Sequence, residues 1–456
     1  MMMKYDNKKI EQIKKWLAKN NIADVEILVS DFAGISRGKV MPTAKFVDGL
    51  RSYGHRVPET LFGLGINCDF SFNNFITEQE IDLFLVPDLS TMRILPWHET
   101  PTACVICNPI REDGELTEVA PRQVLQRVLR HYETKGWQPI IAPEFEFFLL
   151  ARQETIEREP MPPRGASGKV AWDTGELSIT GLEEFKAVFS DISSYCRIMG
   201  IQIDTLTHEA GPAQFEVNIS HGEPLAIADQ SFLFKRIVKR VAIQHGMFAT
   251  FMAKPYPDQY GSAMHMHQSV VDKETGKNIF ADAKGNDTPL FLSYIAGLQK
   301  YIPAVMPMLA PYANSYLRIC DHTDAPVNTH WGRENRTAGL RVPSGGKTAR
   351  RVENRIAGAD VNPYLAFAAS LIAGYLGMIE ELEPDAPTVE KAYESEEHRL
   401  PQHLFSSLDE MEDCDILYEY LGEAFVQTYL DVKREEYMAN INALSPWEIR
   451  YLLLNV

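Results

Sequence analysis

The sequence predicts an α+β protein made of two folding units. In residues 20–110, short strand-like runs such as residues 25–29 and 83–86 are separated by turns. From residue 117 onward, strands alternate with long helices, and no internal repeat interrupts the pattern. A chain of 456 residues can bury a large core in more than one unit. We therefore expect one domain at residues 20–110 and a larger one at residues 117–456.

Helices are predicted before the first unit and within the second. The first is amphipathic and carries its apolar side chains on one stripe: Ile10, Ile13, Trp16 and Leu17. A second helix at residues 121–134 follows a turn signal at residues 111–114. The apolar run at residues 363–379 is too short for a typical membrane span, so we expect a buried core helix there. The chain after residues 383–387 is expected to be mostly helical.

The composition excludes several classes of function. The formal net charge is −17, so the chain has no basic surface to neutralise the phosphates of a nucleic acid or to dock on anionic lipid. We find no signal-peptide pattern and expect a cytoplasmic protein without a membrane partner. Among six scattered cysteines, only Cys104 and Cys107 have a metal-like spacing, and a single such pair is a weak zinc signal.

Two acidic residues alternate with phenylalanines in the strand-like run at residues 140–148. They are Glu144 and Glu146. Side chains two apart on a strand point to the same face, so these two carboxylates are expected roughly 7 Å apart. On its own, the pattern also fits a half-exposed strand whose glutamates face water.

The same alternation recurs in three later segments. Glu216 lies between apolar residues, His265 and His267 alternate with methionines, and Glu353 lies in a run that also holds two arginines. If these strands are neighbours, five carboxylates and a histidine face one cavity: Glu144, Glu146, Glu209, Glu216, Glu353 and His265. Like charges at that density destabilise a sheet unless cations neutralise them.

We expect these side chains to bind divalent metal ions. Ligands rich in carboxylate with one imidazole suit Mg²⁺ or Mn²⁺, whereas zinc favours more Cys and His. Six ligands exceed the need of one catalytic ion that leaves positions for substrate and water, so two or more ions are expected per site. His267 on its own is equally well explained as a structural histidine.

A run of cationic residues follows within forty positions. Its members are Arg318, Arg336, Arg341, Lys347, Arg350, Arg351 and Arg355. A solvated basic face is the usual explanation of such a run, but here the arginines adjoin an apolar strand that carries Glu353. This combination favours a clamp on phosphate or carboxylate oxygens, and metals with arginines are typical of phosphoryl transfer. Neither common glycine-rich nucleotide motif, G-x-x-x-x-G-K-[ST] or G-x-G-x-x-G, is present.

Six motifs together resemble the glutamine synthetase family in order and spacing. They lie at residues 143–147, 209–216, 254–269, 314–318, 335–338 and 350–365. The resemblance runs from about residue 20 to the C-terminus. It implies an N-terminal β-grasp domain at residues 20–110 and a catalytic domain whose antiparallel sheet lines a funnel-shaped site between subunits. Such proteins form six-membered rings, so a homo-oligomer is expected, either a hexamer or a stacked dodecamer.

The resemblance also implies roles for individual residues, with ATP, glutamate and an amine as substrates. Glu146, Glu209 and Glu216 would hold one metal ion, and Glu144, His265 and Glu353 the other. ATP would contact His267, Ser269, Arg341, Lys347 and Arg351. Glutamate would contact Gly261, Arg318, Arg336 and Arg355. Of these, Arg336 and Arg355 would also stabilise the transferring phosphoryl group, which makes Arg336 a catalytic residue.

The sequence departs from true glutamine synthetases where ammonia would bind. The family's ammonium-binding aspartate is absent from residues 58–65, which include the small and apolar Phe62, Gly63 and Leu64. The flap glutamate of the family is replaced by Asp324, one methylene shorter. In this the chain resembles the γ-glutamylpolyamine (γ-glutamylputrescine) synthetases, and we expect an amine pocket formed by Phe62, Gly63, Leu64 and Asp324. Asp324 would act as a base toward the amine or pair with its distal ammonium, although a polar flap residue facing water fits equally well.

The predicted reaction is ATP-dependent γ-glutamylation of a primary amine, putrescine or another polyamine. It would proceed through γ-glutamyl phosphate and release ADP and phosphate. The alternatives are a glutamine synthetase that uses ammonia and a γ-glutamyl ligase for a monoamine or an aromatic amine. A non-enzymatic homologue is disfavoured because all six expected metal ligands are present.

Overall fold

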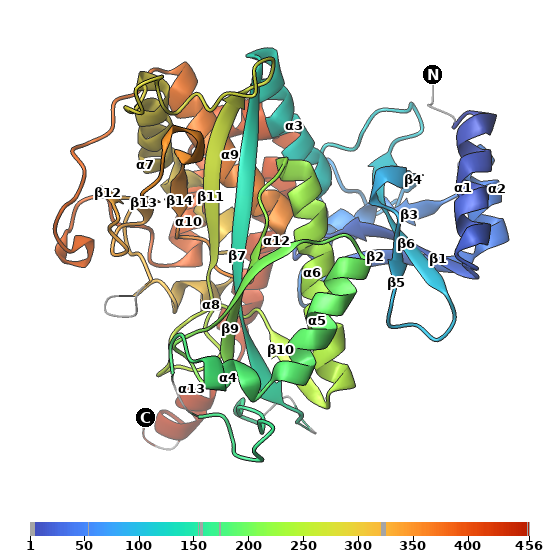
Figure 1. Cartoon of the computed structure of the whole chain (residues 1–456), viewed down its shortest axis with the longest axis horizontal. Coiled ribbons are helices and arrows are strands. Elements are labelled where there is room, and N and C mark those ends of the chain that lie inside the picture. The colour runs from blue at the N-terminus through green and yellow to red at the C-terminus, as the bar shows by residue number, and fades with distance from the viewer. Residues whose placement is uncertain are drawn as a thin grey trace.

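The computed structural model describes residues 5–52, 54–153, 155, 158–172, 175–320, 325–453 and 455. Figure 1 shows the N-terminal strands and helices, in blue, on one side of a larger body that holds the rest of the chain. Each part is centred on a β-sheet against which helices pack. This architecture confirms the predicted α+β class.

The first sheet consists of short strands from the N-terminal part of the chain. They are β1 (Asp24–Ser30), β2 (Ser36–Pro42), β3 (Arg56–Pro58), β4 (Asp82–Pro87), β5 (Arg93–Leu95) and β6 (Thr102–Ile110). Their order is β2-β1-β6-β4-β3, with β5 paired to β6. β1 and β6 run parallel, and the other pairs are antiparallel.

Two helices flank this sheet, α1 (Asn7–Lys19) and α2 (Thr43–Ser52). Helix α1 begins where the Asp6 side chain accepts a hydrogen bond of 2.6 Å from the backbone amide of Lys9, which satisfies one of the free donors of the first turn. Ile10, Ile13 and Leu17 are buried. The predicted apolar stripe of this helix is therefore confirmed.

The second sheet is the frame of the larger body. Its strands are β7 (Trp137–Ala151), β8 (Ile203–His208), β9 (Gln214–Ile219), β10 (Met247–Thr250), β11 (Met264–Asp272), β12 (Trp331–Arg333), β13 (Leu340–Val342) and β14 (Val352–Asn354). Their order is β12-β13-β14-β11-β7-β9-β8, with β10 paired to β7. All pairs are antiparallel except β12 with β13, so the predicted antiparallel sheet is confirmed.

Helices form the layer behind this sheet and the C-terminal part of the chain. They are α3 (Pro121–Thr134), α4 (Ile179–Glu183), α5 (Lys186–Ile198), α6 (Pro224–Gln244), α7 (Pro289–Leu309), α8 (Ala313–Tyr316), α9 (Pro363–Ile379), α10 (Leu404–Glu412), α11 (Asp415–Leu421), α12 (Glu423–Asn442) and α13 (Pro446–Tyr451). Helix α9 is buried along almost its whole length, as its apolar sequence predicts. It packs closely on α7, where a Cβ atom on Gly297 would lie 2.6 Å from Gly377 Cα. Within the described ranges, no helix is long and apolar enough to cross a membrane.

The alternation of side chains along β7 separates the core from the polar face of the sheet. Ile141, Phe145 and Phe147 are fully buried, and the Phe145 ring lies 5.6 Å from the Phe234 ring on α6. Because successive side chains on a strand point to opposite faces, Glu144 projects away from this helical layer. The helices therefore hold the sheet by its apolar face and leave its acidic face open.

A buried ion-pair network joins the helical layer to the end of β4. Arg122 on α3 donates two hydrogen bonds of 2.8 Å to the carboxylate of Asp229 on α6. The same guanidinium donates to Asp88 at 2.7 Å. Tyr364 on α9 donates to Asp229 at 2.7 Å. Burial lowers the pKa of the Arg122 guanidinium, but the hydrogen bonds and charge of Asp229 outweigh burial and raise it.

Replacing Arg122 with Ala is expected to lower the free energy of unfolding by about 3–5 kcal/mol, because Asp229 would stay buried without its cationic partner. Arg130, an exposed residue on the same helix, supplies the control, since Arg130→Ala should change stability by no more than about 0.5 kcal/mol. Denaturant unfolding of both variants measures the difference. Equal stability of the two would contradict a structural role for this network.

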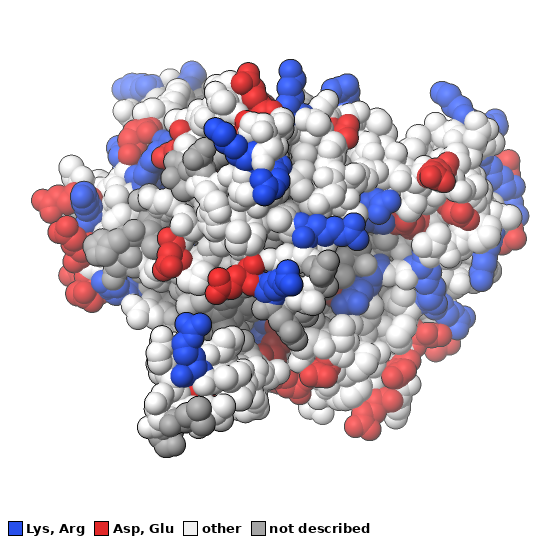
Figure 2. Space-filling model, turned by 90° about the horizontal axis from the view of Figure 1, so that it is seen from below, with Lys and Arg blue, Asp and Glu red and all other residues white. Residues whose placement is uncertain are grey.

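Charged side chains are mixed on the surface. Figure 2 shows Lys and Arg interspersed with Asp and Glu over one face, without a continuous basic stripe.

Candidate active site

Four neighbouring strands bring the predicted acids and histidines together. In the register of the sheet, Glu144 lies opposite His265, and Glu146 lies opposite Glu216. His267 lies opposite Glu353, which in turn lies opposite Arg341. Side chains of directly opposed residues share a face of the sheet. The side chains that the two-residue period selects on each strand therefore lie on one face of the sheet.

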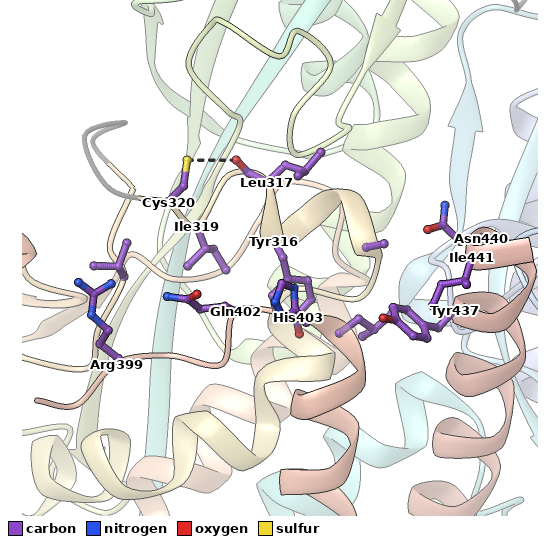
Figure 3. Close-up of a pocket in the computed structure, with 13 residues that line it drawn as sticks. Tyr316, Leu317, Ile319, Cys320, Arg399, Gln402, His403, Tyr437, Asn440 and Ile441 are labelled. Carbon is purple, nitrogen blue, oxygen red and sulfur yellow. Dashed lines mark hydrogen bonds between the residues drawn. The ribbon is translucent and has the colours of Figure 1, made fainter. Parts of the chain in front are cut away.

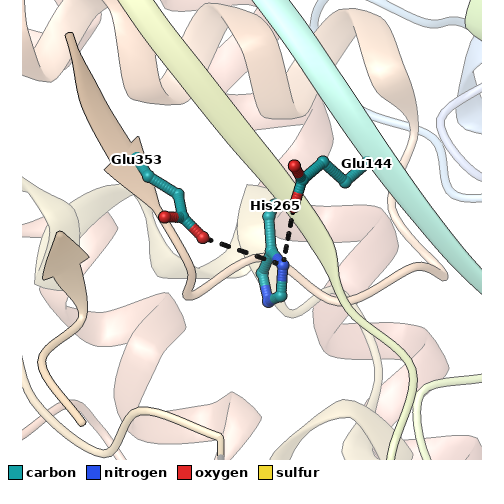
Figure 4. A group of neighbouring side chains, drawn as sticks. All are labelled: Glu144, His265 and Glu353. Carbon is teal, nitrogen blue, oxygen red and sulfur yellow. Dashed lines mark hydrogen bonds and ion pairs between the residues drawn. The ribbon is translucent and has the colours of Figure 1, made fainter. Parts of the chain in front are cut away.

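Two groups of possible metal ligands share a single histidine. Figure 4 shows the first group, in which His265 points between Glu144 and Glu353. His265 Nδ1 lies 3.3 Å from Glu144 Oε2 and 3.9 Å from Glu353 Oε1. The second group joins Glu146 and Glu216 to the same histidine, with His265 Nε2 at 3.9 Å from Glu146 Oε1. Within each group the ligand atoms lie within 4.8 Å of one another.

These groups line a cavity of about 740 Å³, which we call the acidic cavity. Its wall holds the carboxylates Glu144, Glu146, Glu176, Glu209, Glu216 and Glu353, the arginines Arg318, Arg336, Arg341 and Arg355, and His265. All six expected metal ligands are thus in one cavity. Glu209 is separate from the two close groups, although it faces the same space.

The acids on the β9 side of the cavity hold their protons more tightly than usual. Burial, together with the charge of Glu209, raises the pKa of Glu146. Burial and the neighbouring charges of Glu144 and Glu146 raise the pKa of Glu216. Such shifts arise when carboxylates crowd together without a compensating cation.

Two other acids of the cavity, Glu353 on β14 and Glu144 on β7, are stabilised as anions. Burial raises the pKa of Glu353, but the Arg355 guanidinium and the charge of His265 outweigh burial and lower it to about 2. One Glu353 oxygen accepts from Arg355 at 2.6 Å, and the other accepts from Arg341 at 2.7 Å. Burial is likewise outweighed at Glu144, where hydrogen bonds from the two histidines lower the pKa.

The donor set fits divalent metal ions. Five carboxylates and one imidazole are the ligands preferred by Mg²⁺ or Mn²⁺ rather than by zinc. The raised pKa values of Glu146 and Glu216 mark a place where added positive charge would restore ionisation. The C-x-x-C pair differs, because Cys104 and Cys107 are buried on β6 and belong to no group of possible ligands among the described residues.

The predicted glutamate-binding residues also reach the acidic cavity. Arg318 is buried, and its guanidinium donates to the backbone oxygen of Ile356. Gly261 lies so close that a Cβ atom there would be 2.4 Å from Arg318 Cγ, which explains why a glycine is needed. Arg355 is buried beside Glu353, whereas Arg336 is exposed at the cavity wall.

A second cavity of about 380 Å³, which we call the side cavity, adjoins the first at Glu144 and Asn218. His267, Ser269 and Arg351, three of the five residues expected to bind ATP, line it. Arg351 Nε donates to His267 Nδ1 at 3.2 Å, and His267 Nε2 lies 2.9 Å from Glu144 Oε1. The side cavity is thus linked to the acidic cavity through a short chain of contacts.

The other two residues expected to bind ATP lie elsewhere. Arg341 lines the acidic cavity and is paired with Glu353 and Glu334. Lys347 lies on an exposed turn and lines neither cavity, although its neighbours Thr348 and Ala349 line the side cavity.

Among the described residues of one chain, those expected to form the amine pocket do not line the acidic cavity. Phe62, Gly63 and Leu64 do not line the acidic cavity; the first two are buried and Leu64 is half-buried. The segment that follows is held against α12 of the same chain, where the Ile66 amide donates to Glu436 Oε1 at 2.6 Å. Asp324 lies outside the described residues, but the next residue, Ala325, lines the acidic cavity.

Several residues of the site had no role in the sequence-based interpretation. Gln214 donates to Glu146 at 3.2 Å, and Asn218 donates to Glu144 at 3.0 Å. Both lie two residues from Glu216 on β9, so the strand periodicity could have identified them. Glu176 and Leu177 also line the acidic cavity, but they belong to an irregular segment without periodicity.

A third cavity, of about 550 Å³, lies on the other side of the turn that carries Arg318. Figure 3 shows Tyr316, Leu317 and Tyr437 on its wall, with a hydrogen bond of 3.3 Å from Cys320 Sγ to the backbone oxygen of Leu317. Among the described residues that line it, none is Asp or Glu. The described part of its lining therefore lacks the carboxylates that distinguish the acidic cavity.

The chain is similar to known ligases along almost its whole length. Residues 118–452 match the glutamine synthetase catalytic domain. Gamma-glutamylputrescine synthetase PuuA of Escherichia coli (strain K12) is 34% identical over 466 residues, covering 98% of this chain and 95% of the relative. Glutamine synthetase of Methanocaldococcus jannaschii is 32% identical (97% and 98% covered), and glutamate–isopropylamine ligase of a Pseudomonas species is 30% identical (99% and 99% covered).

A solved structure gives the same relationship in three dimensions. "Apo GmaS without ligand" superposes with a TM-score of 0.80 at 26% identity, covering 96% of this chain and 98% of that chain. The chain belongs to the glutamine synthetase family. It is an ATP-dependent ligase that acts on glutamate with ammonia or an amine, in a family that uses divalent metal ions.

Proposed function

We propose that this enzyme joins the γ-carboxylate of glutamate to a primary amine of the putrescine or polyamine class. The observation that carries the proposal is the complete set of acids around His265, together with the lack of an aspartate in residues 58–65. The similarity to a γ-glutamylputrescine synthetase supports it. The metal and phosphate chemistry of the family is kept, while the amine differs from ammonia.

The proposed metal ligands are the six side chains of the acidic cavity. Glu144, His265 and Glu353 would hold one ion; Glu146, Glu216 and Glu209 would hold another. When bound, Mg²⁺ or Mn²⁺ neutralises the phosphate oxygens of ATP and orients them for transfer. Because the side cavity opens beside Glu144, ATP would enter there, against His267, Ser269 and Arg351.

The reaction has two steps. A γ-carboxylate oxygen of glutamate attacks the terminal phosphorus of ATP, the bond to the bridging oxygen breaks, and ADP leaves with the electron pair. Arg318 and Gly261 would hold the amino-acid end of glutamate, while Arg336 and Arg355 would balance the charge of the transferring group. The product of this step is γ-glutamyl phosphate.

In the second step the amine nitrogen attacks the γ-carbonyl carbon and phosphate leaves. The amine must first lose a proton, because an alkylammonium ion has no free electron pair. Asp324 is proposed as the acceptor of that proton. In a site that excludes water, a carboxylate can take this role because the charged ammonium is less stabilised there.

The proposal includes an assembly of several chains. We divide the chain into a β-grasp domain at residues 20–110 and a catalytic domain at residues 117–456. The segment with Leu64 would complete the acidic cavity of an adjacent subunit in a hexameric ring or a stacked dodecamer. Such an arrangement is favoured because this segment does not line the acidic cavity of its own chain. We place the enzyme in the cytoplasm.

A comparison of amines tests the proposal. With ATP, glutamate and Mg²⁺ present, ADP release should be much faster with putrescine or a longer polyamine than with ammonium, ethylamine or aniline at equal concentration. Ammonium as the best substrate would identify a glutamine synthetase and overturn the proposal. A preference for ethylamine or aniline would identify a monoamine or aromatic-amine ligase, the alternative that the isopropylamine-ligase relative favours.

A further inference from the structure

Glu176 and Leu177 hold a fixed position at the wall of the acidic cavity beside Glu209. They precede the short helix α4, which lies against β8. The Leu177 amide donates to the backbone oxygen of His208 at 2.8 Å, which ties this segment to the residue before Glu209. Ser178 then caps α4 by accepting from the Gly181 amide at 3.0 Å. These two hydrogen bonds hold the backbone from which the side chains of Glu176 and Leu177 project.

The Glu176 carboxylate is available to a ligand. It is exposed, and in the part of the chain that the structure describes it has no hydrogen-bond or ion-pair partner. Glu144 and Glu353 in the same cavity are instead already bound by histidines and arginines. Glu176 and Glu209 both line the acidic cavity, so this part of its wall carries two carboxylates. An ammonium group near Glu176 would be attracted to this negative charge.

Leu177 presents an apolar surface next to this free charge. Its side chain is 70% exposed and lines the cavity, and its backbone has a φ of 61°, in a region that bulky residues rarely adopt. The backbone thus holds a leucine at the cavity wall and not in the core. An apolar contact followed by a carboxylate matches an alkyl chain that ends in an ammonium group.

Glutamate and ATP are assigned to other parts of the site, so the wall with Glu176 and Leu177 is open to the amine. In the proposed function, Arg318 and Gly261 take the amino-acid end of glutamate, and the side cavity takes ATP. The part of the wall that carries Glu176 and Leu177, next to the proposed metal ligand Glu209, has no substrate assigned.

We propose that Glu176 and Leu177 form the subsite for the far end of a diamine or polyamine substrate. Leu177 contacts the methylene chain, and the Glu176 carboxylate binds the distal ammonium. The distal nitrogen keeps its proton and takes no part in forming the amide, so Glu176 determines specificity and is not a catalytic residue. This inference rests on the proposed amine ligase function, and it selects diamines over ammonia and monoamines.

The test compares two amines with the same carbon chain, putrescine and butylamine, in the full-length enzyme with ATP, glutamate and Mg²⁺. Glu176→Gln should lower kcat/KM for putrescine about 10- to 100-fold, mainly through KM, because one charge-assisted hydrogen bond is lost. For butylamine the change should be less than about threefold. Glu183→Gln is the control, since Glu183 is an exposed acid on α4 that does not line the cavity. It should change neither value.

A second variant tests the apolar contact. Leu177→Asn suits the positive φ, since asparagine tolerates the left-handed region, but it removes the hydrocarbon surface. It should lower kcat/KM for putrescine and butylamine by similar factors, about 3- to 10-fold each. Thermal melting of each variant verifies that it is folded.

The outcomes separate this inference from the proposed function. If the wild-type enzyme prefers putrescine to ammonium, but Glu176→Gln keeps the wild-type ratio of putrescine to butylamine activity, the subsite is wrong and the ligase proposal stands. Equal use of putrescine and butylamine by the wild-type enzyme would likewise rule out an ammonium site at Glu176. If ammonium is the best wild-type substrate, both proposals are wrong.

Discussion

Replacing Glu353 with Gln is expected to lower amine- and glutamate-dependent ADP formation by at least about 100- to 1000-fold. Glu353 is 1% exposed and lies opposite His267 on the neighbouring strand, with its carboxylate turned toward His265. In the proposed site it is one of three ligands of a metal ion that neutralises the transferring phosphate. Glutamine keeps the shape of the side chain but removes the negative charge that such an ion requires.

Glu334 provides a matched control for this substitution. It also accepts a hydrogen bond of 2.7 Å from Arg341, but it lies on the exposed side of that arginine and does not line the acidic cavity. Glu334→Gln should therefore keep most of the activity. Initial rates of ADP release at saturating substrates and Mg²⁺ measure both variants, and thermal melting shows that each is folded. Undiminished turnover of Glu353→Gln would show that the proposed metal site is wrong.

The second large effect is a pH-dependent stabilisation by metal ions. Burial and mutual repulsion raise the pKa of Glu146 and Glu216 in the folded chain above the ordinary value of 4.5. As pH rises from that value through the raised pKa values, the unfolded chain has already released these protons while the folded chain still holds them. These groups therefore destabilise the metal-free protein progressively over that range. A bound divalent cation reverses the effect, because it stabilises the ionised carboxylates.

The melting temperature measures this linkage. The metal-free enzyme should lose stability between about pH 6 and about pH 8.5, and Mg²⁺ or Mn²⁺ should raise the melting temperature more at the higher pH. At 100 times its dissociation constant, one ion contributes about 2.7 kcal/mol. The double variant Glu146→Gln/Glu216→Gln should lose most of this response. If the metal ion raised the melting temperature equally at both pH values, Glu146 and Glu216 would not be the protonated acids that the ion displaces protons from.

Strand periodicity made much of the site predictable from the sequence. Glu144, Glu146 and Glu216 were identified because a two-residue period inside apolar runs places them on one face, and the structure brings them together. What periodicity cannot supply is the register between strands. The pairing of His265 with Glu144, and of Arg341 with Glu353, depends on long-range packing of β7, β11, β13 and β14.

The remaining parts of the site depend on irregular segments. Lys347 has the charge and position in sequence of a phosphate-binding residue, yet its turn holds it outside both cavities of the isolated chain. Phe62 lies in a segment whose apolar residues predict a pocket, but in the folded chain its ring is part of the core. Glu176 is placed by a backbone hydrogen bond from its neighbour Leu177 to His208 at the end of β8, a long-range contact that no local pattern encodes.

The measurement that tests the central claim most directly is product identification in a mixture. The enzyme is given ATP, glutamate, Mg²⁺ and equal concentrations of ammonium and putrescine, and the products are quantified by mass spectrometry. We expect γ-glutamylputrescine to form in equal amount to ADP, with little glutamine. Glutamine as the main product, or ADP release without any γ-glutamylamide, would contradict the account.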